Sequence, residues 1–501
     1  MRIEVEAGIN GCVLITDSYE SELKCLTQHS LAFLEQQTDR CMPRTLILSD
    51  SDATDYHLIC NDVNRAVTDN LLQEVIFVGS KFISYKTSFC FDNKCFYETL
   101  SDFLQSDFFK RVSNQTILVK VAPKYDVSMI LNRLRLLVHD TVLEIDFNAL
   151  HKNVSYFRSK LQPNTKLMCM VKASAYGSGS VEVSRALQYW NADYLAVAFV
   201  DEGVELRQDG IKMPILVLDP SVDALERIVE YRLEPEIYSF RILKAMLETL
   251  RRLGIKDYPV HIKFDTGMHR AGFEKEDINE LISLLNESPE IKVVSVFSHL
   301  VGSDEERFDA FSMSQIEYFR FCATRLEQHL AYPIMKHILN SSGIERFSPY
   351  QFDMVRLGIG LWGISCMGER LWNVCSLKTK ISQIRNVKQG DTIGYSRNGI
   401  VSHNSKIALL PLGYADGIDR RLGNGKLSVW INGRPYPTIG NVCMDLMMID
   451  ITDAQDVKEG DEVMVFGSSQ PLSVVAHLLG TIPYEVLTSI APRVRRVYFD
   501  E

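Results

Sequence analysis

Lysine 172 is the residue of this chain with the clearest chemical potential. It follows a short apolar run, Leu167 to Val171, and precedes a turn rich in small residues that extends to Gly179. A lysine at the carboxyl end of a buried strand is partly desolvated, which lowers its pKa and frees the amine to attack an aldehyde. The small residues leave room for a phosphate. This pattern suggests a Schiff base with pyridoxal phosphate, although a strand-end lysine that reaches solvent has the same local sequence.

Polar residues and glycines recur after other apolar runs. These segments are His261 to Arg270, Ser298 to Leu300, Asn340 to Gly343 and Arg356 to Gly360. Ser341 and the backbone amides of Gly358 and Ile359 could hold a phosphate. Each residue also has a purely structural explanation: Ser341 as a helix cap, Gly358 as a turn glycine and His299 as a hydrogen-bonded core histidine. Their shared position after apolar runs favours a common site.

Short apolar runs alternate with amphipathic segments between Leu167 and Leu357, the rhythm of repeated βα units. We expect eight strands, at Leu167–Lys172, Tyr194–Val197, Pro214–Leu218, Pro235–Tyr238, Val260–Phe264, Val293–Phe297, Ile334–Ile338 and Asp353–Leu357. Helical patterns include Val222–Tyr231, Phe240–Leu253, Asp277–Asn286 and Met313–His329. Eight parallel strands with intervening helices indicate a (β/α)8 barrel, whose active site lies at the carboxyl ends of the strands.

The regions on either side of these repeats have different patterns. After Gly363 the spacing is all-β, with expected strands at Ile407–Leu412, Leu427–Ile431, Thr438–Ile439, Leu446–Ile449 and Glu462–Phe466. Before His139, apolar runs separated by helical stretches predict a small α/β, Rossmann-like domain; these runs are Val13–Ile15, Thr45–Leu48, Val75–Val78 and Thr116–Val119. We therefore predict three domains: residues 1–138, a barrel at 139–375 and a β-domain at 376–501.

The composition narrows the class of protein. At 501 residues, two or three domains are expected. The 54 basic and 64 acidic residues give a net charge of -10, which argues against nucleic acid or an anionic membrane as the main partner. No apolar stretch has membrane-spanning length and the start lacks a signal-peptide core, so we expect a cytoplasmic protein. The 11 cysteines include no Cys-x-x-Cys pair, so neither a disulfide framework nor a thiolate metal site is expected.

From roughly His139 to its end, the chain resembles the alanine racemases, pyridoxal phosphate enzymes with a barrel and a carboxyl-terminal β-domain. The resemblance rests on a long, ordered series of motifs: Met170–Ala173, Ala175–Gly177, Lys263, Asp265–Met268, Arg270, Ser298–His299, Asn340–Ser341, Val355–Ile359, Gly394–Tyr395, Gly413–Gly417, Cys443–Asp445 and Tyr484–Glu485. It implies interconversion of L-alanine and D-alanine, supplying D-alanine for peptidoglycan. Three positions depart from the usual family residue, Ser174, Ser178 and Trp362, and these put local packing in doubt rather than activity.

The resemblance also implies roles for individual residues. Lys172 would form the internal aldimine and act as one catalytic base, while Tyr395 would be the second base, supplied with Met444 across a homodimer interface. Arg270 would contact the substrate carboxylate, and Lys263 matches a position that is often a carbamylated lysine. The implied cofactor-binding positions are Lys172, Tyr176, His299, Asn340, Ser341, Arg356, Gly358, Ile359 and Tyr484.

These roles agree with the chemistry of racemisation. A proton leaves Cα on one face and another returns on the opposite face, so two opposed bases suit the reaction better than one. A free tyrosine has a pKa near ~10, so positive charge from the group of His299 and Arg356 is needed to favour a Tyr395 phenolate. Because arginine acts only as a donor, Arg356 should keep the pyridine nitrogen unprotonated. That weakens the electron sink and limits transamination.

The first 138 residues resemble a different family, the carboxyl-terminal domain of the Mur ligase that adds D-alanyl-D-alanine to the cell-wall precursor. The resemblance rests on Gly8–Gly11, Ile15–Tyr19 and Leu46–Asp50. The ligase's ATP-binding domain is missing, because no Gly-x-x-x-x-Gly-Lys-Ser/Thr motif occurs. Two usual motifs are also altered, at Tyr19–Leu23 and Lys120–Lys124. We therefore expect no ligase activity.

Two rival classes share this barrel, and the sequence argues against both, whereas the breadth of the substrate range stays open. A pyridoxal phosphate decarboxylase of the same barrel class would need a glycine-triplet phosphate loop and an acidic substrate-binding residue, neither of which we find. A non-catalytic pyridoxal phosphate-binding protein would lack the β-domain with Tyr395. A racemase of broader range that also accepts serine is not distinguished by the sequence.

Overall fold

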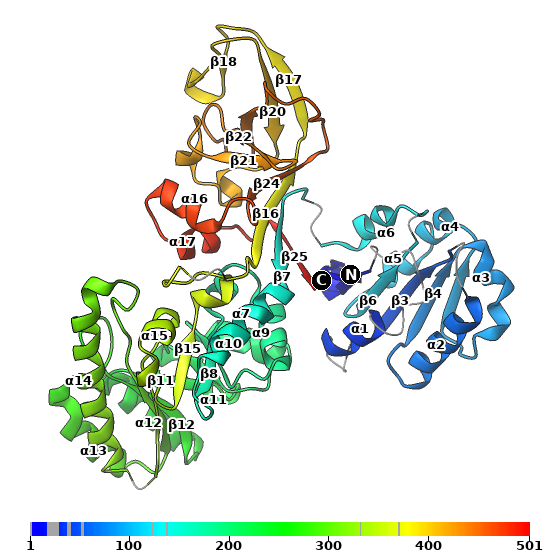
Figure 1. Cartoon of the computed structure of the whole chain (residues 1–501). Helices are drawn as coiled ribbons and strands as arrows, with labels where there is room; N and C mark the ends of the chain where they lie inside the picture. Colours follow the sequence, from blue (N-terminus) through cyan, green and yellow to red (C-terminus); the bar gives the residue numbers. More distant parts are fainter. Residues whose placement is uncertain are drawn as a thin grey trace. The chain divides into compact units, whose positions relative to one another are not determined.

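The computed structural model describes residues 3–17, 30–37, 42–51, 55–122, 124–136, 139–330, 332–368 and 371–500. It contains two compact units (Figure 1). One unit is Ala149–Val374, and the other combines Met1–Asn148 with Cys375–Glu501. The altered motif at Tyr19–Leu23 and the predicted boundary at residue 138 lie outside the described residues. No helix in the described parts of the chain is long and apolar enough to cross a membrane.

The unit Ala149–Val374 is a nearly closed parallel barrel of eight strands. The strands are β8 (Lys166–Met170), β9 (Tyr194–Val197), β10 (Ile215–Val217), β11 (Glu234–Ile237), β12 (Tyr258–Lys263), β13 (Ile291–Phe297), β14 (Met335–His337) and β15 (Met354–Leu357). They pair in chain order from β8 to β14, and β15 pairs with β8. Hydrogen bonds from Asp353 N to Lys336 O and from Arg356 N to Leu339 O, of 3.0 and 2.9 Å, join the last two strands. All eight predicted strands and the barrel are confirmed.

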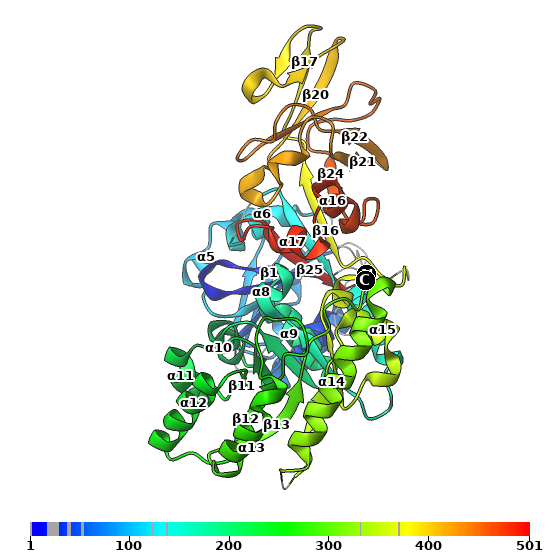
Figure 2. The same cartoon turned by 90° about the vertical axis from the view of Figure 1, so that its left-hand side faces the viewer.

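Helices flank these strands in Figures 1 and 2. They are α7 (Phe147–Ser159), α8 (Lys172–Tyr176), α9 (Ser180–Tyr189), α10 (Val200–Gln208), α11 (Leu225–Glu230), α12 (Phe240–Leu253), α13 (Ile278–Asn286), α14 (Asp309–Glu327) and α15 (Ser341–Arg346). Helix α12 spans the predicted residues because its ends are capped. The Ser239 side chain accepts a hydrogen bond from Ile242 N, and Gly254 ends the helix with a φ of +67°.

The other unit contains a sheet of 12 strands. Their order is β22 (Arg434–Pro437), β21 (Ser428–Ile431), β24 (Glu462–Phe466), β16 (Cys375–Lys380), β7 (Val142–Asp146), β25 (Arg495–Asp500), β1 (Ile3–Ala7), β2 (Val13–Thr16), β6 (Thr116–Lys120), β3 (Arg44–Ser49), β4 (Glu74–Val78) and β5 (Lys94–Tyr97). The last strand of the chain, β25, lies parallel to β7 and antiparallel to β1. The β-domain and the amino-terminal α/β domain therefore share one continuous sheet, a long-range pairing that local sequence pattern does not predict.

Smaller elements complete the β-domain. A three-stranded sheet contains β17 (Gln383–Val387), β20 (Ser405–Leu410) and β23 (Met447–Asp450), and a two-stranded sheet contains β18 (Thr392–Ile393) and β19 (Gly399–Ile400). Two helices follow, α16 (Leu472–Leu479) and α17 (Pro483–Thr488). The predicted strand at Thr438–Ile439 is wrong, because Thr438 forms a single bridge to Ile449 and the neighbouring strand β22 ends at Pro437.

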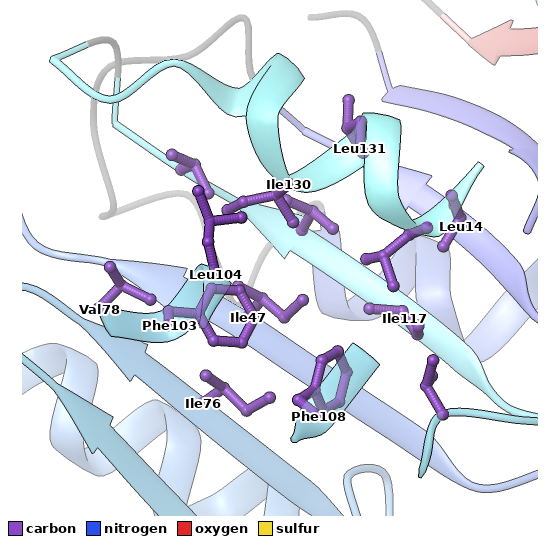
Figure 3. Packing of buried hydrophobic residues seen from close by; sticks show 14 of the residues in the cluster. Leu14, Ile47, Ile76, Val78, Phe103, Leu104, Phe108, Ile117, Ile130 and Leu131 are labelled. Atoms are coloured by element: carbon purple, nitrogen blue, oxygen red, sulfur yellow. The ribbon is translucent and has the colours of Figure 1, made fainter. Parts of the chain in front are cut away.

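The amino-terminal domain is an α/β layer with an apolar core (Figure 3). Its strands β2 to β6 pair in parallel, and β1 is antiparallel to β2. Its helices are α1 (Leu31–Gln37), α2 (Tyr56–Thr68), α3 (Ser80–Ser84), α4 (Leu100–Leu104), α5 (Phe108–Arg111) and α6 (Val127–Leu134). Helix α6 directs Ile130 and Leu131 toward the sheet, where they pack in one cluster with Leu14 and Ile117. The four strands predicted here are confirmed as β2, β3, β4 and β6, whereas β1 and β5 were not predicted.

Glu6 on β1 links the two ends of the chain electrostatically. Its buried carboxylate accepts hydrogen bonds from Arg135 Nε at 2.7 Å and from Arg495 Nη1 at 2.6 Å. Replacing Glu6 with Gln should lower the free energy of unfolding by about 3 kcal/mol, because both guanidinium groups would keep little compensation in a mostly buried place. Urea unfolding measures this change. Asp107→Asn is the control, because Asp107 pairs with Lys110 at the exposed surface and its replacement should leave the free energy of unfolding close to that of wild type.

Candidate active site

Lys172 lies just after the first barrel strand, in an unusual backbone turn. Strand β8 ends at Met170, two residues before the predicted end, because the chain then turns left-handed. Four consecutive residues from Ala173 to Tyr176 have φ between +49° and +58°, and none is glycine. Each such residue costs roughly 1–2 kcal/mol, and strain of this kind is kept mainly where it positions functional groups. The turn is held by Glu202, whose carboxylate accepts from Ala173 N at 2.6 Å.

The surroundings of Lys172 favour its neutral amine. Burial lowers the pKa of Lys172, and the positive charges of Arg270 and Lys263 lower it further, against the opposing effect of Glu202 and Glu236. This environment is the one that the sequence predicted for a reactive lysine. A less basic amine is more often free to attack a carbonyl or to accept a proton.

Arg356 is buried on β15 and held by four residues. Its Nη1 donates to His337 Nδ1 at 2.7 Å and to His337 O at 3.3 Å. Its Nη2 donates to Ser298 O at 2.5 Å, to Ile338 O at 3.0 Å and to His299 Nδ1 at 3.3 Å. Burial lowers the pKa of Arg356 to about 10, so the group stays protonated at neutral pH. The Nε–H has no acceptor among the described residues, which leaves it available to a ligand.

His299 is a neutral neighbour of this arginine. Burial and the charge of Arg356 hold the pKa of His299 well below its ordinary value. The predicted positive charge of the pair therefore belongs to Arg356 alone, and the expectation that His299 shares it is wrong. As a hydrogen-bond acceptor, His299 helps to orient the guanidinium instead.

The predicted phosphate-binding residues are brought together beside β15. Ser341 Oγ accepts hydrogen bonds from Gly358 N at 2.9 Å and Gly360 N at 3.2 Å. A Cβ at residue 358 would lie 2.8 Å from the Tyr176 hydroxyl, so only glycine allows this approach. Ile359 follows directly as the first residue of a 3-10 turn. The Tyr176 and Ser341 hydroxyls and the backbone amides beside them thus form a donor-rich cradle. It suits a phosphate that would replace Ser341 Oγ as the acceptor for the amides of Gly358 and Gly360.

Asn340 has the helix-capping role that the sequence pattern also allowed for Ser341. Its Oδ1 accepts from Gly343 N at 2.9 Å and from Ser303 Oγ at 2.8 Å, so Asn340 caps helix α15. The interpretation of Ser341 as the helix cap is wrong, because its hydroxyl faces the backbone of Gly358 and Gly360.

Arg270 lies at the exposed end of the loop after β12. Asp265 organises this loop by accepting from the backbone amides of Gly267, Met268 and Arg270, each at 2.8 Å. Burial raises the pKa of the Asp265 carboxyl, but these backbone donors outweigh that effect and hold the pKa below its ordinary value. The loop is therefore braced by an ionised carboxylate at neutral pH.

Lys263 forms a buried ion pair that the sequence did not predict. Its Nζ lies 2.9 Å from Oε1 of Glu236 on the neighbouring strand β11. Burial raises the pKa of Glu236 to about 7, although Lys263 and the more distant Arg356 and Arg270 oppose this shift. The signal available in the sequence was a glutamate between Pro235 and Ile237 in the predicted strand, a place where the structure buries all three residues of Pro235–Ile237 in β11 (Glu234–Ile237). Charged residues are almost never buried without a partner.

The raised pKa of Glu236 predicts a pH-dependent stability. A carboxyl whose pKa is higher in the folded protein contributes stability below its ordinary pKa, and this contribution is lost as the pH rises through about 7. Between about pH 5 and about pH 8, wild-type stability should therefore fall by roughly 2–3 kcal/mol relative to Glu236→Gln. Urea unfolding at several pH values measures this difference. Glu280→Gln is the control, because Glu280 is exposed and wild-type stability relative to this variant should not change with pH. If wild type loses as much stability relative to Glu280→Gln as relative to Glu236→Gln, the prediction is wrong.

The remaining predicted residues lie in the other unit. Tyr395 is 70% exposed, and Met444 and Tyr484 are also exposed. Tyr395 follows Gly394, whose φ of +74° requires glycine, and Asn441 Nδ2 donates to the Tyr395 carbonyl at 3.0 Å. The backbone at Tyr395 is thus fixed while its side chain stays at the surface.

The residues of the barrel unit fit pyridoxal phosphate. The donor-rich cradle at Tyr176, Ser341 and Gly358 suits its phosphate, and the unpaired Nε–H of Arg356 suits a ring nitrogen. Lys172 offers the amine of lowered pKa that a Schiff base needs.

Comparisons with known proteins agree with this arrangement. The family model "Alanine racemase, N-terminal domain" matches residues 145–366, and "Alanine racemase, C-terminal domain" matches residues 374–498. Alanine racemase 1 of Oceanobacillus iheyensis is 38% identical over 375 residues, covering 72% of this chain and 98% of that protein. The solved alanine racemase of Clostridium difficile 630 has a TM-score of 0.69 at 34% identity and covers 73% of this chain and 97% of its own. A Bartonella henselae alanine racemase with covalently bound pyridoxal phosphate has a TM-score of 0.66 at 28% identity, covering 72% and 99%.

Proposed function

Since this chain belongs to the alanine racemase family, we propose that Lys172 and Tyr395 are the two bases of its reaction. The chain is a pyridoxal phosphate-dependent isomerase that interconverts L-alanine and D-alanine. The observation that carries the assignment of bases is the strained turn that presents Lys172, with its lowered pKa, at the end of the first barrel strand. The matching tyrosine motif of the β-domain supplies the second base.

The barrel residues would hold the cofactor and one side of the substrate. When bound, pyridoxal phosphate withdraws electrons from the substrate Cα and makes its proton acidic. Lys172 would hold the cofactor covalently, and its phosphate would be held by Tyr176, Ser341 and the amides of Gly358 and Ile359. Arg356, which stays protonated and can only donate, would offer its Nε–H to the pyridine nitrogen and so favour the unprotonated form of that nitrogen.

The substrate is positioned by a second group of residues. Arg270 binds the substrate carboxylate, and the loop braced by Asp265 fixes the backbone from which it extends. Three further residues position the groups to which they are bonded and do not bind the substrate themselves: Lys263, His299 and Asn340. Lys263 lies 2.9 Å from Glu236, and a carbamate on this lysine would bring a second acidic group to that carboxyl, so carbamylation is the weaker of the two interpretations.

We propose that the active unit is a homodimer. The β-domain exposes several large apolar or aromatic side chains, which include Tyr395, Tyr414, Met444, Leu446, Ile482 and Tyr484. Backbone hydrogen bonds from Tyr414 N to Cys443 O and from Ala415 N to Met444 O bring two of these segments together. Exposed apolar groups that lie together are typical of protein interfaces. In the dimer, Tyr395 and Met444 of one subunit would complete the site of the other.

The amino-terminal domain belongs to a different family from the rest of the chain in this proposal. We propose that residues 1–138 are a Mur ligase-like domain without ligase activity, followed by the barrel and the β-domain, and that the chain works in the cytoplasm to supply D-alanine for the cell wall. None of the proposed catalytic residues lies in residues 1–138.

A chain that begins at His139 should therefore keep its kcat/KM for alanine within about threefold of the full chain and remain a dimer. Its melting temperature should fall, because β25 would lose its neighbour β1 and become an exposed edge strand. Racemase assays, light scattering and thermal unfolding test these three outcomes. A truncated dimer that binds the cofactor but cannot racemise alanine would show that the domain takes part in the chemistry.

An assay of the purified chain with L-alanine and with L-serine tests the proposed function directly. Chiral chromatography should detect D-alanine, and the ratio of the two kcat/KM values decides between an alanine racemase and one of broader range. A protein that binds pyridoxal phosphate but racemises neither amino acid would instead support the non-catalytic alternative.

A further inference from the structure

A continuous chain of buried hydrogen bonds crosses five adjacent strands of the barrel. Each strand from β11 to β15 contributes one residue: Glu234, His261, Ser295, His337 and Arg356. The four links are Glu234 Oε2 to His261 Nε2 at 2.8 Å, His261 Nδ1 to Ser295 Oγ at 2.6 Å, Ser295 Oγ to His337 Nε2 at 2.9 Å and His337 Nδ1 to Arg356 Nη1 at 2.7 Å. We call this set the relay.

The arginine end of the relay fixes the tautomer of His337. Arginine has no acceptor, so His337 Nδ1 must accept and its Nε2 must carry the proton that is donated to Ser295. At the other end, the carboxylate form of Glu234 accepts a hydrogen bond from His261 Nε2. When the His261 ring carries its single proton on Nε2, the Ser295 hydroxyl donates to His261 Nδ1, and the donors run in one direction from Arg356 to Glu234.

The environment of the relay supports this arrangement. His261, Ser295 and His337 are fully buried, and Phe297 stacks on His337 with ring centroids 4.7 Å apart. Burial and the charge of Arg356 hold the pKa of His337 well below its ordinary value, so this ring is neutral and can accept from the arginine. In such a place, one broken link would leave a buried donor or acceptor unpaired.

We propose that Glu234, His261, Ser295 and His337 are positioning residues that fix the orientation of Arg356 from the opposite side of the barrel. The relay and the backbone carbonyls occupy Nη1 and Nη2 and leave the Nε–H for the ring nitrogen of the cofactor. This inference rests on the proposed role of Arg356. If the arginine moves, the pyridine nitrogen gains a proton more easily and the abortive transamination increases, in which alanine and bound pyridoxal phosphate become pyruvate and pyridoxamine phosphate.

Ser295→Ala breaks the relay at its centre and is the main test. Ser312→Ala is the matched control, because Ser312 is equally buried and its hydroxyl has no hydrogen-bond partner among the described residues. Glu234→Gln removes only the charge at the far end. Its control is Glu290→Gln, since the side chains of Glu234 and Glu290 are both 14% exposed but Glu290 pairs with Arg251 on the outside of the unit.

Four properties of the holoenzyme are compared: kcat, the pyruvate formed per racemisation, the visible absorption of the bound cofactor and the orientation of the Arg356 guanidinium in crystal structures. We expect the ratio of pyruvate to racemised alanine to rise by about tenfold in Ser295→Ala, the size of one lost buried hydrogen bond, with a smaller rise in Glu234→Gln. The absorption should shift and the Arg356 guanidinium should move, whereas neither control should change any of the four.

The outcomes separate this inference from the proposed function. If wild-type protein binds no pyridoxal phosphate or racemises nothing, the proposed function fails first. If wild-type protein is active and Ser295→Ala binds the cofactor with an unchanged spectrum, an unchanged pyruvate ratio and Arg356 in place, the relay does not position the arginine. A fall in melting temperature without these changes would also overturn the inference, because it shows a purely structural role.

Discussion

Replacing Lys172 with alanine should lower kcat/KM for racemisation by at least about 10³-fold and remove the visible absorption of the bound cofactor. The substitution deletes both the covalent attachment and one of the two bases. Absorption spectra and racemase assays at saturating pyridoxal phosphate measure the two losses separately. The remaining cradle, with Ser341 and Arg356, should still bind the cofactor weakly and without a covalent bond.

The control for this prediction is Lys166→Ala. Lys166 is an exposed lysine at the start of the same strand, β8, so its removal tests the loss of a positive charge without touching the strained turn. It should leave the absorption and the rate close to wild type. Full absorption in Lys172→Ala, or equal losses in the two variants, would contradict the assignment.

Replacing Tyr395 with phenylalanine should stop proton transfer on one face of the substrate and leave the cofactor bound. A lost base of this kind typically costs about 10²–10⁴-fold in rate. In deuterated water, Lys172 can still exchange the Cα proton of the enantiomer that faces it. One enantiomer of alanine should therefore gain deuterium without racemising, while the other gains almost none.

Mass spectrometry of alanine recovered from separate L-alanine and D-alanine incubations measures this asymmetry. Tyr189→Phe is the control, because Tyr189 is an exposed tyrosine on α9 of the barrel unit and should leave both exchange rates unchanged. Equal loss of exchange from both enantiomers in Tyr395→Phe would show that the tyrosine is not a face-specific base.

The barrel could be predicted from the sequence because its signals are local. Each strand is a short apolar run and each helix an amphipathic segment, so strands such as Tyr194–Val197 and helices such as Phe240–Leu253 were predicted at their observed bounds. Lys172 was found for the same reason, since it follows an apolar strand. The predicted strand was two residues too long, because four non-glycine residues in left-handed conformation are not signalled by residue type.

The rest of the site depends on contacts between residues far apart in the chain. The pair of Lys263 and Glu236 and the relay from Arg356 to Glu234 join residues on different strands, and each residue alone resembles an ordinary polar group in a strand. The pairing of β1 with β25 joins the two ends of the chain. Propensity and periodicity describe each segment by itself, so they carry no information about these partners.

Borohydride reduction of the purified protein shows directly whether the cofactor is attached to Lys172. The reagent reduces the carbon–nitrogen double bond between cofactor and lysine to a stable single bond, so the labelled lysine can be identified by mass spectrometry after proteolysis. We predict one pyridoxyl group per chain, on Lys172. A label on any other lysine, or no label on a chain that racemises alanine, would contradict the site described above.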